Sequence, residues 1–235
     1  MSEPTFQAFS PEHLIAIFLT VALPFALAAV ARAAKSALAE HAVVGALSAI
    51  LFANYAGYLL FVRGLGELEW QQMLPLQMCD WAMAVVIVAL WTKNHRWFEV
   101  AYFWGIGGTL QAVLTPNLRF GFPDLRFVSF FISHGGIIVA VGFLMLTRGL
   151  RPYPFSIVRA FVWSELYFLV TLLADHLTGV NYGFLLHKPE AFSLLSFLSD
   201  DRPLYLLQMH GLALVFFAVL YLPFALYDSI RQARL

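Results

Sequence analysis

Charged residues and cysteine are both scarce in this chain of 235 residues. Charged side chains make up 12% of it, against roughly 25% in an ordinary soluble domain, whereas hydrophobic side chains make up 61%. Cys79 is the only cysteine, which excludes an intramolecular disulfide and leaves the redox compartment undetermined. The formal net charge is zero and no dense Lys/Arg cluster occurs, which argues against nucleic-acid binding and against a polybasic lipid anchor.

Motifs of several enzyme classes are also missing. No GxGxxG, P-loop or GxSxG pattern occurs. The chain also lacks the CxxC and HxxxH spacings that are typical of zinc sites. We therefore predict no metal site, although Cys79, His134 and His210 are residue types that bind zinc.

What the sequence does contain is seven stretches that are apolar for long enough to cross a bilayer. A crossing of ~30 Å takes about 20 helical residues, so little chain remains for a soluble module, and we predict one transmembrane domain over 1–235. The spans are expected to be helices, because no alternating pattern of a β-barrel appears. The segment before the first span has no Lys or Arg, which indicates a retained span rather than a secretory signal peptide. The predicted spans are 14–31, 42–62, 76–92, 98–115, 127–147, 156–177 and 204–226.

The basic residues predict the orientation of these spans, since cytoplasmic loops carry the excess of Lys and Arg. Nine of them fall in one set of segments and five in the other, which predicts the N-terminus outside and the C-terminus inside. The long connections 116–126 and 178–203 then lie outside, and this indicates that the outer face is the working face. The set of nine is Arg32, Lys35, Lys93, Arg96, Arg148, Arg151, Arg159, Arg231 and Arg234, and the set of five is Arg63, Arg119, Arg126, Lys188 and Arg202.

Polar residues gather near the predicted outer ends of the spans. At about 1.5 Å of rise per residue, Cys79 lies within about two turns of the start of the third span, and His134 lies roughly 10 Å into the fifth. Several polar groups at one depth predict a shared cavity, because each is costly in contact with hydrocarbon. Besides Cys79 and His134, the candidate pocket residues are Gln77, Asp80, Gln111, Thr115, Asn117, Asp175 and His210.

These residue types suit acyl transfer through a thioester. The N-termini of the third, fifth and seventh spans are expected to point toward the polar layer, where their partial positive charge favours an anion, a developing oxyanion or a thiolate. Cys79 would be the nucleophile, and His134 would take its proton if the two helices are adjacent. This chemistry requires no bound cofactor.

Two other interpretations remain open at this stage. Cys79 is also explained as a small buried hydrophobe, and His134 as a member of a glycine-rich helix contact in Ser133-His134-Gly135-Gly136. Glu165 lies near the middle of the sixth span, where an acidic residue is typical of a transporter. The alternative function is therefore a transporter or lipid-binding membrane protein that uses Glu165, Asp175 and the histidines, although no inverted repeat supports it.

Five segments carry a resemblance to a known family: Leu74–Asp80, Tyr102–Gly105, Leu110–Pro116, Phe131–Gly135 and Asn181–Leu185. Between about Leu74 and Pro223 the chain resembles the YwaF-like family of bacterial membrane proteins, which is related to the eukaryotic transmembrane protein 164.

The resemblance implies a cysteine-dependent acyltransferase that moves fatty acyl chains between glycerophospholipids, with Cys79 as the acyl-accepting nucleophile and His134 as its partner. It also directs attention to Asn181 and Tyr182 as residues that line the pocket with Gln111. We therefore predict a seven-helix acyltransferase or lipid-remodelling thioesterase in a bacterial cytoplasmic membrane, with a phospholipid or another acyl lipid as its partner. The oligomeric state is not predicted.

Overall fold

The computed structural model describes residues 5–67, 69–190 and 193–233, and this part of the chain is helical with no β-strand. Its only strand-like pairing is an isolated bridge between Thr5 and Phe120. The helices are α1 (Pro11–Ala33), α2 (Ala37–Gly64), α3 (Met78–Thr92), α4 (His95–Trp104), α5 (Leu110–Leu114), α6 (Leu125–Arg148), α7 (Pro154–Thr178) and α8 (Arg202–Gln232), with short segments η1 (Trp70–Met73), η2 (Gly105–Thr109), η3 (Tyr182–Phe184) and η4 (Leu194–Phe197).

Six helices of the described chain are long and apolar enough to cross a membrane: α1, α2, η1 with α3, α6, α7 and α8. The chain is therefore an integral, multi-pass membrane protein. The predicted fourth span, 98–115, is helical but not continuous, because the five-residue π-helix η2 separates α4 from α5. Together α4, η2 and α5 reach from His95 to Leu114, roughly 30 Å at the rise of an α-helix, so this broken helix has the length of a seventh crossing.

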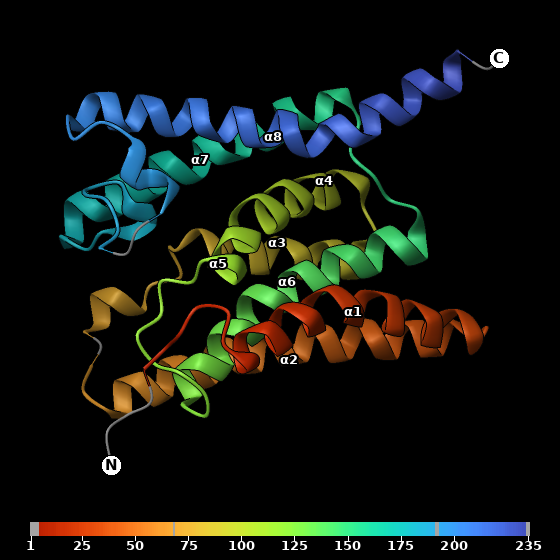
Figure 1. Ribbon diagram of the computed structural model, residues 1–235, viewed down its shortest axis with the longest axis horizontal. Helices are drawn as coiled ribbons and strands as arrows, with labels where there is room; N and C mark the ends of the chain where they lie inside the picture. Colours follow the sequence, from red (N-terminus) through yellow and green to blue (C-terminus); the bar gives the residue numbers. More distant parts are fainter. Residues whose placement is uncertain (1–4, 68, 191–192, 234–235) are drawn as a thin grey trace.

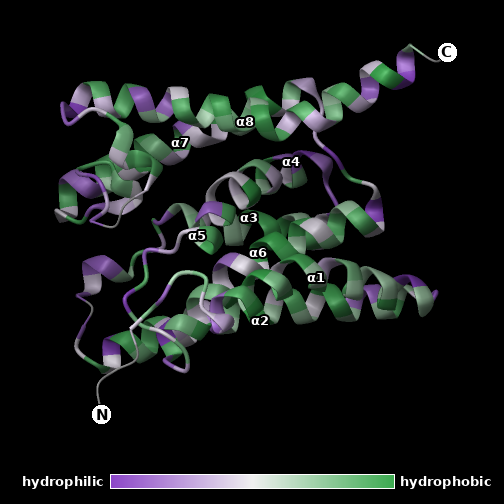
Figure 2. Ribbon diagram, in the orientation of Figure 1, coloured by the Kyte–Doolittle hydropathy of each residue, from purple (hydrophilic) through white to green (hydrophobic). Residues whose placement is uncertain are grey.

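The helices run back and forth along the long axis of the molecule (Figure 1). Helices α1, α2 and α6 lie on one side. Helices α3 and α4 occupy the middle, and the α7–α8 hairpin covers the other side. Helix α6 contacts α1, α2, α3 and α4, whereas α8 contacts mainly α7 and η2. Most residues of the helices are hydrophobic, and the hydrophilic residues gather toward the connections and helix ends (Figure 2), as expected for helices in lipid.

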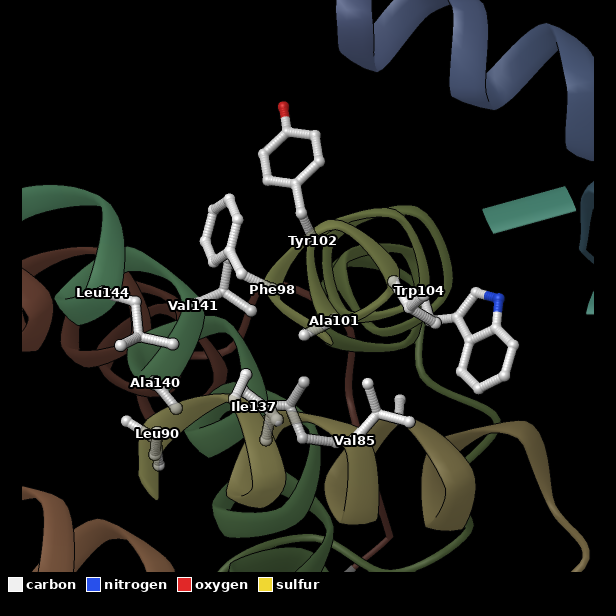
Figure 3. Packing of buried hydrophobic residues seen from close by; sticks show 14 of the residues in the cluster. Val85, Leu90, Phe98, Ala101, Tyr102, Trp104, Ile137, Ala140, Val141 and Leu144 are labelled. Carbon is white, nitrogen blue, oxygen red and sulfur yellow. The ribbon is translucent and has the colours of Figure 1, made fainter. Parts of the chain in front are cut away.

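The buried core lies where α3, α4 and α6 meet (Figure 3). Phe98 of α4 is fully buried there, and Phe103, which is also fully buried, packs on Phe217 of α8. Two aromatic residues of α4 reach the outer layer: the Tyr102 hydroxyl donates to the Leu220 carbonyl at 2.9 Å, and the Trp104 indole N–H donates to the Ser164 hydroxyl at 2.8 Å. Helix α4 therefore connects the core to the α7–α8 hairpin through both packing and hydrogen bonds.

Glycines on α6 allow its neighbours to approach closely, as the Ser133-His134-Gly135-Gly136 segment predicted. A methyl group at Gly135 would lie 2.6 Å from the Thr20 hydroxyl oxygen of α1, and one at Gly136 would lie 2.9 Å from Leu51 of α2. Gly142 is equally close to Pro24 of α1. Since helix association in lipid depends on close van der Waals contact, these glycines fix how α1 and α2 pack on α6.

The two ends of the bundle differ in their polar residues. At one end lie the short connections α1–α2, α3–α4 and α6–α7 and the end of α8; the long connections α5–α6 and α7–α8 lie at the other (Figure 1). Ion pairs tie down the first end, where Arg151 contacts Asp228 at 2.6 Å and Arg159 contacts the buried Glu99 at 2.5 Å. Arg234, which entered the charge count, lies outside the described residues.

We expect Gly142→Ala to destabilise the protein. The new methyl group would lie 2.9 Å from Cβ and 3.0 Å from Cγ of Pro24, whose ring cannot rotate away, and overpacking of this kind costs about 1–3 kcal/mol. The control is Gly57→Ala on α2, where no atom lies within 4 Å and the added methyl should stabilise the helix by about 0.5–1 kcal/mol. Thermal unfolding in detergent should give opposite shifts; equal shifts would contradict the packing role of Gly142.

We also predict that an N-terminal tag is accessible from outside the cell and a C-terminal tag from the cytoplasm. The nine-to-five division of basic residues and the seven alternating helical segments both lead to this orientation. Protease protection in oriented membranes measures it directly. Accessibility of both tags from one side would rule out an odd number of crossings.

Candidate active site

A cavity of about 690 Å³ lies between the α7–α8 hairpin and the layer formed by α3 to α6. Its volume falls within the range of about 300–1,000 Å³ that is usual for small-molecule pockets. Apolar and aromatic side chains form most of its wall, with contributions from α3, α4, α6, α7, α8 and the segment after α7. The predicted site residues that line it are Gln77, Cys79, Gln111, Thr115, Asn117, His134 and His210.

A second cavity of about 280 Å³ adjoins the first on the side of α2 and α6. Cys79 and His134 line both cavities, so the two side chains stand on the wall between them. Asp80 lines only the smaller cavity. The structure therefore brings the predicted nucleophile and the predicted base to one place and adds a second chamber that the sequence did not indicate.

Cys79 is the second residue of α3, whose first turn has unpaired backbone donors. The N–H groups of Met78 and Cys79 have no acceptor among the described residues. The side-chain oxygen of Gln77, the residue that precedes the helix, accepts from the Gly183 N–H at 3.2 Å, and the side chain of Gln77 forms no cap hydrogen bond to the first turn of α3. Two backbone N–H groups thus remain available beside the Cys79 sulfur.

The expectation that three helix N-termini serve the site needs correction. In α6 the Asp124 side chain accepts from the Arg126 N–H at 2.7 Å, and in α8 Asp201 accepts from the Leu204 N–H at 3.1 Å. These carboxylates satisfy the first-turn donors and offset the positive end of each helix. Of these three helices, α3 is the one that is not preceded by an acidic capping residue.

The hydrogen bonds of His134 define its proton position. Its Nδ1 lies 2.9 Å from the Phe130 carbonyl oxygen, which accepts but cannot donate, so we assign the proton to Nδ1. Nε2 has no partner among the described residues and therefore presents a lone pair. The ring stacks on Phe130 at a centroid distance of 4.2 Å, which fixes its orientation. His134 is consequently prepared to accept a proton at Nε2.

Asp80 has a mainly local role. Its Oδ2 accepts from the Gln77 N–H at 3.0 Å, and its Oδ1 lies 3.9 Å from the Cys79 sulfur. A carboxylate this close disfavours a second negative charge on the thiol, so it opposes the effect expected from the helix N-terminus. We therefore expect Cys79 to rest as a thiol and to lose its proton only as it reacts.

Three predicted pocket residues line neither of these two cavities: Asp175, Asn181 and Tyr182. They hold the segment after α7 in place: Asp175 accepts from the Tyr182 N–H at 2.8 Å, and Asn181 accepts from the Leu186 N–H at 2.8 Å. The Tyr182 hydroxyl is bonded to the Gln71 carbonyl. The cavity wall is formed instead by the residues that follow, from Gly183 to Leu185.

Glu165, which the sequence places near the middle of the sixth span, lines the same cavity as Cys79. Its Oε2 lies 3.2 Å from His210 Nε2, while His210 Nδ1 lies 2.6 Å from the Leu206 carbonyl. Both histidine nitrogens thus lie within hydrogen-bond distance of an oxygen atom. Helical spacing could have indicated that Glu165 lines the cavity, because Phe161, Glu165 and Phe168 fall on one face of α7.

The broken fourth span supplies one wall of the larger cavity. Trp104, Gly108, Gln111 and Thr115 all line it, and their spacing places them on one face of the helix. The π-helix η2 lies in the middle of this wall, and π-helical turns are frequent at functional sites. The side chains of Gln111 and Asn117 form no hydrogen bond within the described chain, so both carboxamides are available to a ligand.

Comparison with known proteins gives one match. The model of the TMEM164 family matches residues 8–221. No curated protein and no solved structure shows a significant match.

We expect Gly183→Ala to disturb the site. Gly183 has φ +58°, and an added methyl would lie 2.5 Å from the Tyr167 hydroxyl oxygen, so the bond from Gly183 N to Gln77 would be lost. Thermal unfolding should occur at a lower temperature, and maleimide should label Cys79 faster because the covering segment is displaced.

Gly179→Ala is the matched control for this substitution. Gly179 has φ +72° but no atom within 4 Å of an added methyl, so it carries similar backbone strain without the contact to Tyr167. Its labelling rate should stay unchanged. Identical behaviour of the two variants would contradict a role for the contact between Gly183 and Gln77.

Proposed function

Since the chain belongs to the TMEM164 family, we propose that it is a membrane acyltransferase or lipid-remodelling thioesterase that moves a fatty acyl group from a phospholipid through a thioester on Cys79. We further propose that it represents the bacterial YwaF-like branch of this family, with seven crossings and a site that opens toward the outer leaflet. No bound cofactor takes part in this chemistry.

One observation carries the proposal: Cys79 and His134 line the same largely apolar cavity. An acyl chain needs an apolar chamber, and a thioester mechanism needs a nucleophile and a base that reach the same carbonyl carbon. The lone pair on His134 Nε2 and the free N–H groups at the start of α3 complete the set of functional groups.

The acylation step follows from these groups. Nε2 of His134 takes the thiol proton as the sulfur of Cys79 attacks the ester carbonyl carbon of the phospholipid. The oxyanion that forms accepts hydrogen bonds from the N–H groups of Met78 and Cys79. The ester C–O bond then breaks, and the departing lysophospholipid oxygen takes the proton from the His134 imidazolium. The product is acyl-Cys79 and a neutral His134.

The lining of the larger cavity supports a phospholipid as the acyl donor. Phe161, Phe168 and Phe216 provide apolar surface for the hydrocarbon chain. The carboxamides of Gln111 and Asn117 provide donors and acceptors for the ester and headgroup region. A lipid that enters from the bilayer would place its chain and its ester against these two kinds of surface.

A transporter is the second candidate function, and the pair formed by Glu165 and His210 favours it. The two side chains lie within hydrogen-bond distance of each other inside a cavity within the membrane, and paired ionisable residues in such a place are typical of proton-coupled carriers. In an acyltransferase the same pair would only reduce the cost of burying two polar residues. The two functions therefore differ in whether Cys79 or Glu165 is required.

The decisive experiment tests Cys79 for an acyl group. Purified protein incubated with acyl-labelled phospholipid should carry label that hydroxylamine releases. Cys79→Ser should abolish the label, because a hydroxyl is far less ionised than a thiol. His134→Ala should slow labelling by roughly 10²–10⁴, the usual contribution of a general base.

His41→Ala is the matched control, since His41 also bonds a carbonyl four residues earlier but lies on the exposed side of α2. It should leave labelling unchanged, and Glu165→Gln should change it only a few-fold, because the hydrogen-bond partner of Glu165 is His210. Absence of label on Cys79, together with loss of function only in Glu165→Gln, would favour the transporter.

A further inference from the structure

We propose that the smaller cavity binds the acyl acceptor, namely the uncharged, hydroxyl-bearing part of a lysolipid or a small alcohol. This inference rests on the proposed function and assigns the two cavities to the two substrates. The larger cavity holds the donor lipid and its acyl chain, and the acceptor approaches the thioester from the opposite side of the wall formed by Cys79 and His134.

The size of the smaller cavity favours a polar fragment over a second acyl chain. Its volume of about 280 Å³ lies just below the usual range for drug-sized ligands and well below the 690 Å³ of its neighbour. Polar residues also make up a larger share of the residues that line it than of those that line the larger cavity. The polar residues that line it are Tyr55, Tyr58, Gln72, Gln77, Asp80, Asn117, Arg126, Ser129, Ser133 and His134.

Unused hydrogen-bonding groups face this cavity. The hydroxyls of Tyr55 and Tyr58 have no hydrogen-bond partner in the described parts of the chain, although both residues line the cavity. Asn54 Nδ2 donates to the Ser133 hydroxyl oxygen at 2.8 Å, which leaves the Ser133 O–H proton free to donate. Three hydroxyls are thus available to hold an alcohol near Cys79, because an unpaired polar group in the membrane gains most from a ligand partner.

The charged residues near the smaller cavity determine which part of the acceptor can bind there. Arg126 is held by Glu67 at 3.0 Å and by Asp124 at 3.0 Å, and Asp80 adds a third carboxyl group near the cavity. The hydrogen bond from Arg126 lowers the pKa of Asp124, which therefore carries its charge at neutral pH. With one guanidinium among three acidic groups, a phosphate is disfavoured, whereas an uncharged hydroxyl meets no repulsion.

In the transfer step, His134 and Cys79 account for every proton that moves. The acceptor O–H gives its proton to His134 Nε2 as its oxygen attacks the thioester carbonyl carbon. A new C–O bond forms, the C–S bond breaks, and the Cys79 sulfur takes the proton from the imidazolium. The acylated product leaves, and both residues return to their starting states. If water occupies the smaller cavity, the same step releases a free fatty acid.

The test separates acylation from transfer in the full-length protein. The Tyr55→Phe/Tyr58→Phe double variant removes both hydroxyls with little change in volume. Acyl-Cys79 should form from labelled dioleoyl phosphatidylcholine vesicles within twofold of the unsubstituted rate. Transfer of the label to lysophosphatidylethanolamine should fall at least tenfold, the size expected for two lost hydrogen bonds. Parallel reactions with glycerol, and with no added acceptor, distinguish a lipid acceptor from a small alcohol and from water.

Two control variants test the division of roles. Tyr227→Phe removes a hydroxyl from the exposed surface of α8 and should change neither rate. Ala213→Phe fills part of the larger cavity and should slow acylation while transfer from preformed acyl-Cys79 continues. Equal loss of both rates in the double tyrosine variant, or transfer at the unsubstituted rate, contradicts the acceptor site alone. Absence of acyl-Cys79 in the unsubstituted protein contradicts the proposed function instead.

Discussion

An unpaired polar group in hydrocarbon costs several kcal/mol, and this constraint explains where the polar side chains of the protein lie. At the end with the short connections they form pairs, as Arg159 does with the buried Glu99. Toward the other end, several line cavities instead. Glu165 and His210 satisfy the constraint together, because the two side chains form a hydrogen bond with each other. The polar residues that remain unpaired are therefore the ones available to a ligand.

At the start of α3, backbone polar groups remain unpaired in spite of this cost. Most long helices of the chain begin at a Ser, Asp or Asn side chain that accepts a backbone N–H, as Asp124 does for α6. In α3 the preceding residue is Gln77, and its side chain is bonded to Gly183 in the segment after α7. The N–H groups of Met78 and Cys79 remain free, which is the arrangement that an oxyanion requires. The segment after α7 thus contributes to the site, because the Gly183 N–H engages the side-chain oxygen of Gln77.

The division into two cavities follows from how the helices pack. Glycines bring α1 and α2 close to α6, and α4 anchors the α7–α8 hairpin through Tyr102 and Trp104. Space remains on both sides of the first turn of α3, where the long connections replace helix packing. Cys79 and His134 therefore stand between a large chamber and a small one, and polar residues make up a larger share of the residues that line the small one. Two chambers would let donor and acceptor reach one thioester without exchanging places.

The sequence by itself determined the helical membrane class, the six long apolar helices, the close packing at Gly135 and Gly136 and the presence of Gln111 and Thr115 among the residues that line the cavity. These depend on hydropathy and helical spacing, which are local properties. The break at η2, the caps that occupy two helix N-termini and the smaller cavity could not be predicted in this way. Asp175 and Asn181 anchor the loop after α7 through N–H groups that are close in the sequence. Only the tertiary structure decided that Tyr182 contacts Gln71, that Gln77 contacts Gly183 and that Glu165 contacts His210, because each pair joins distant segments whose approach no local pattern encodes.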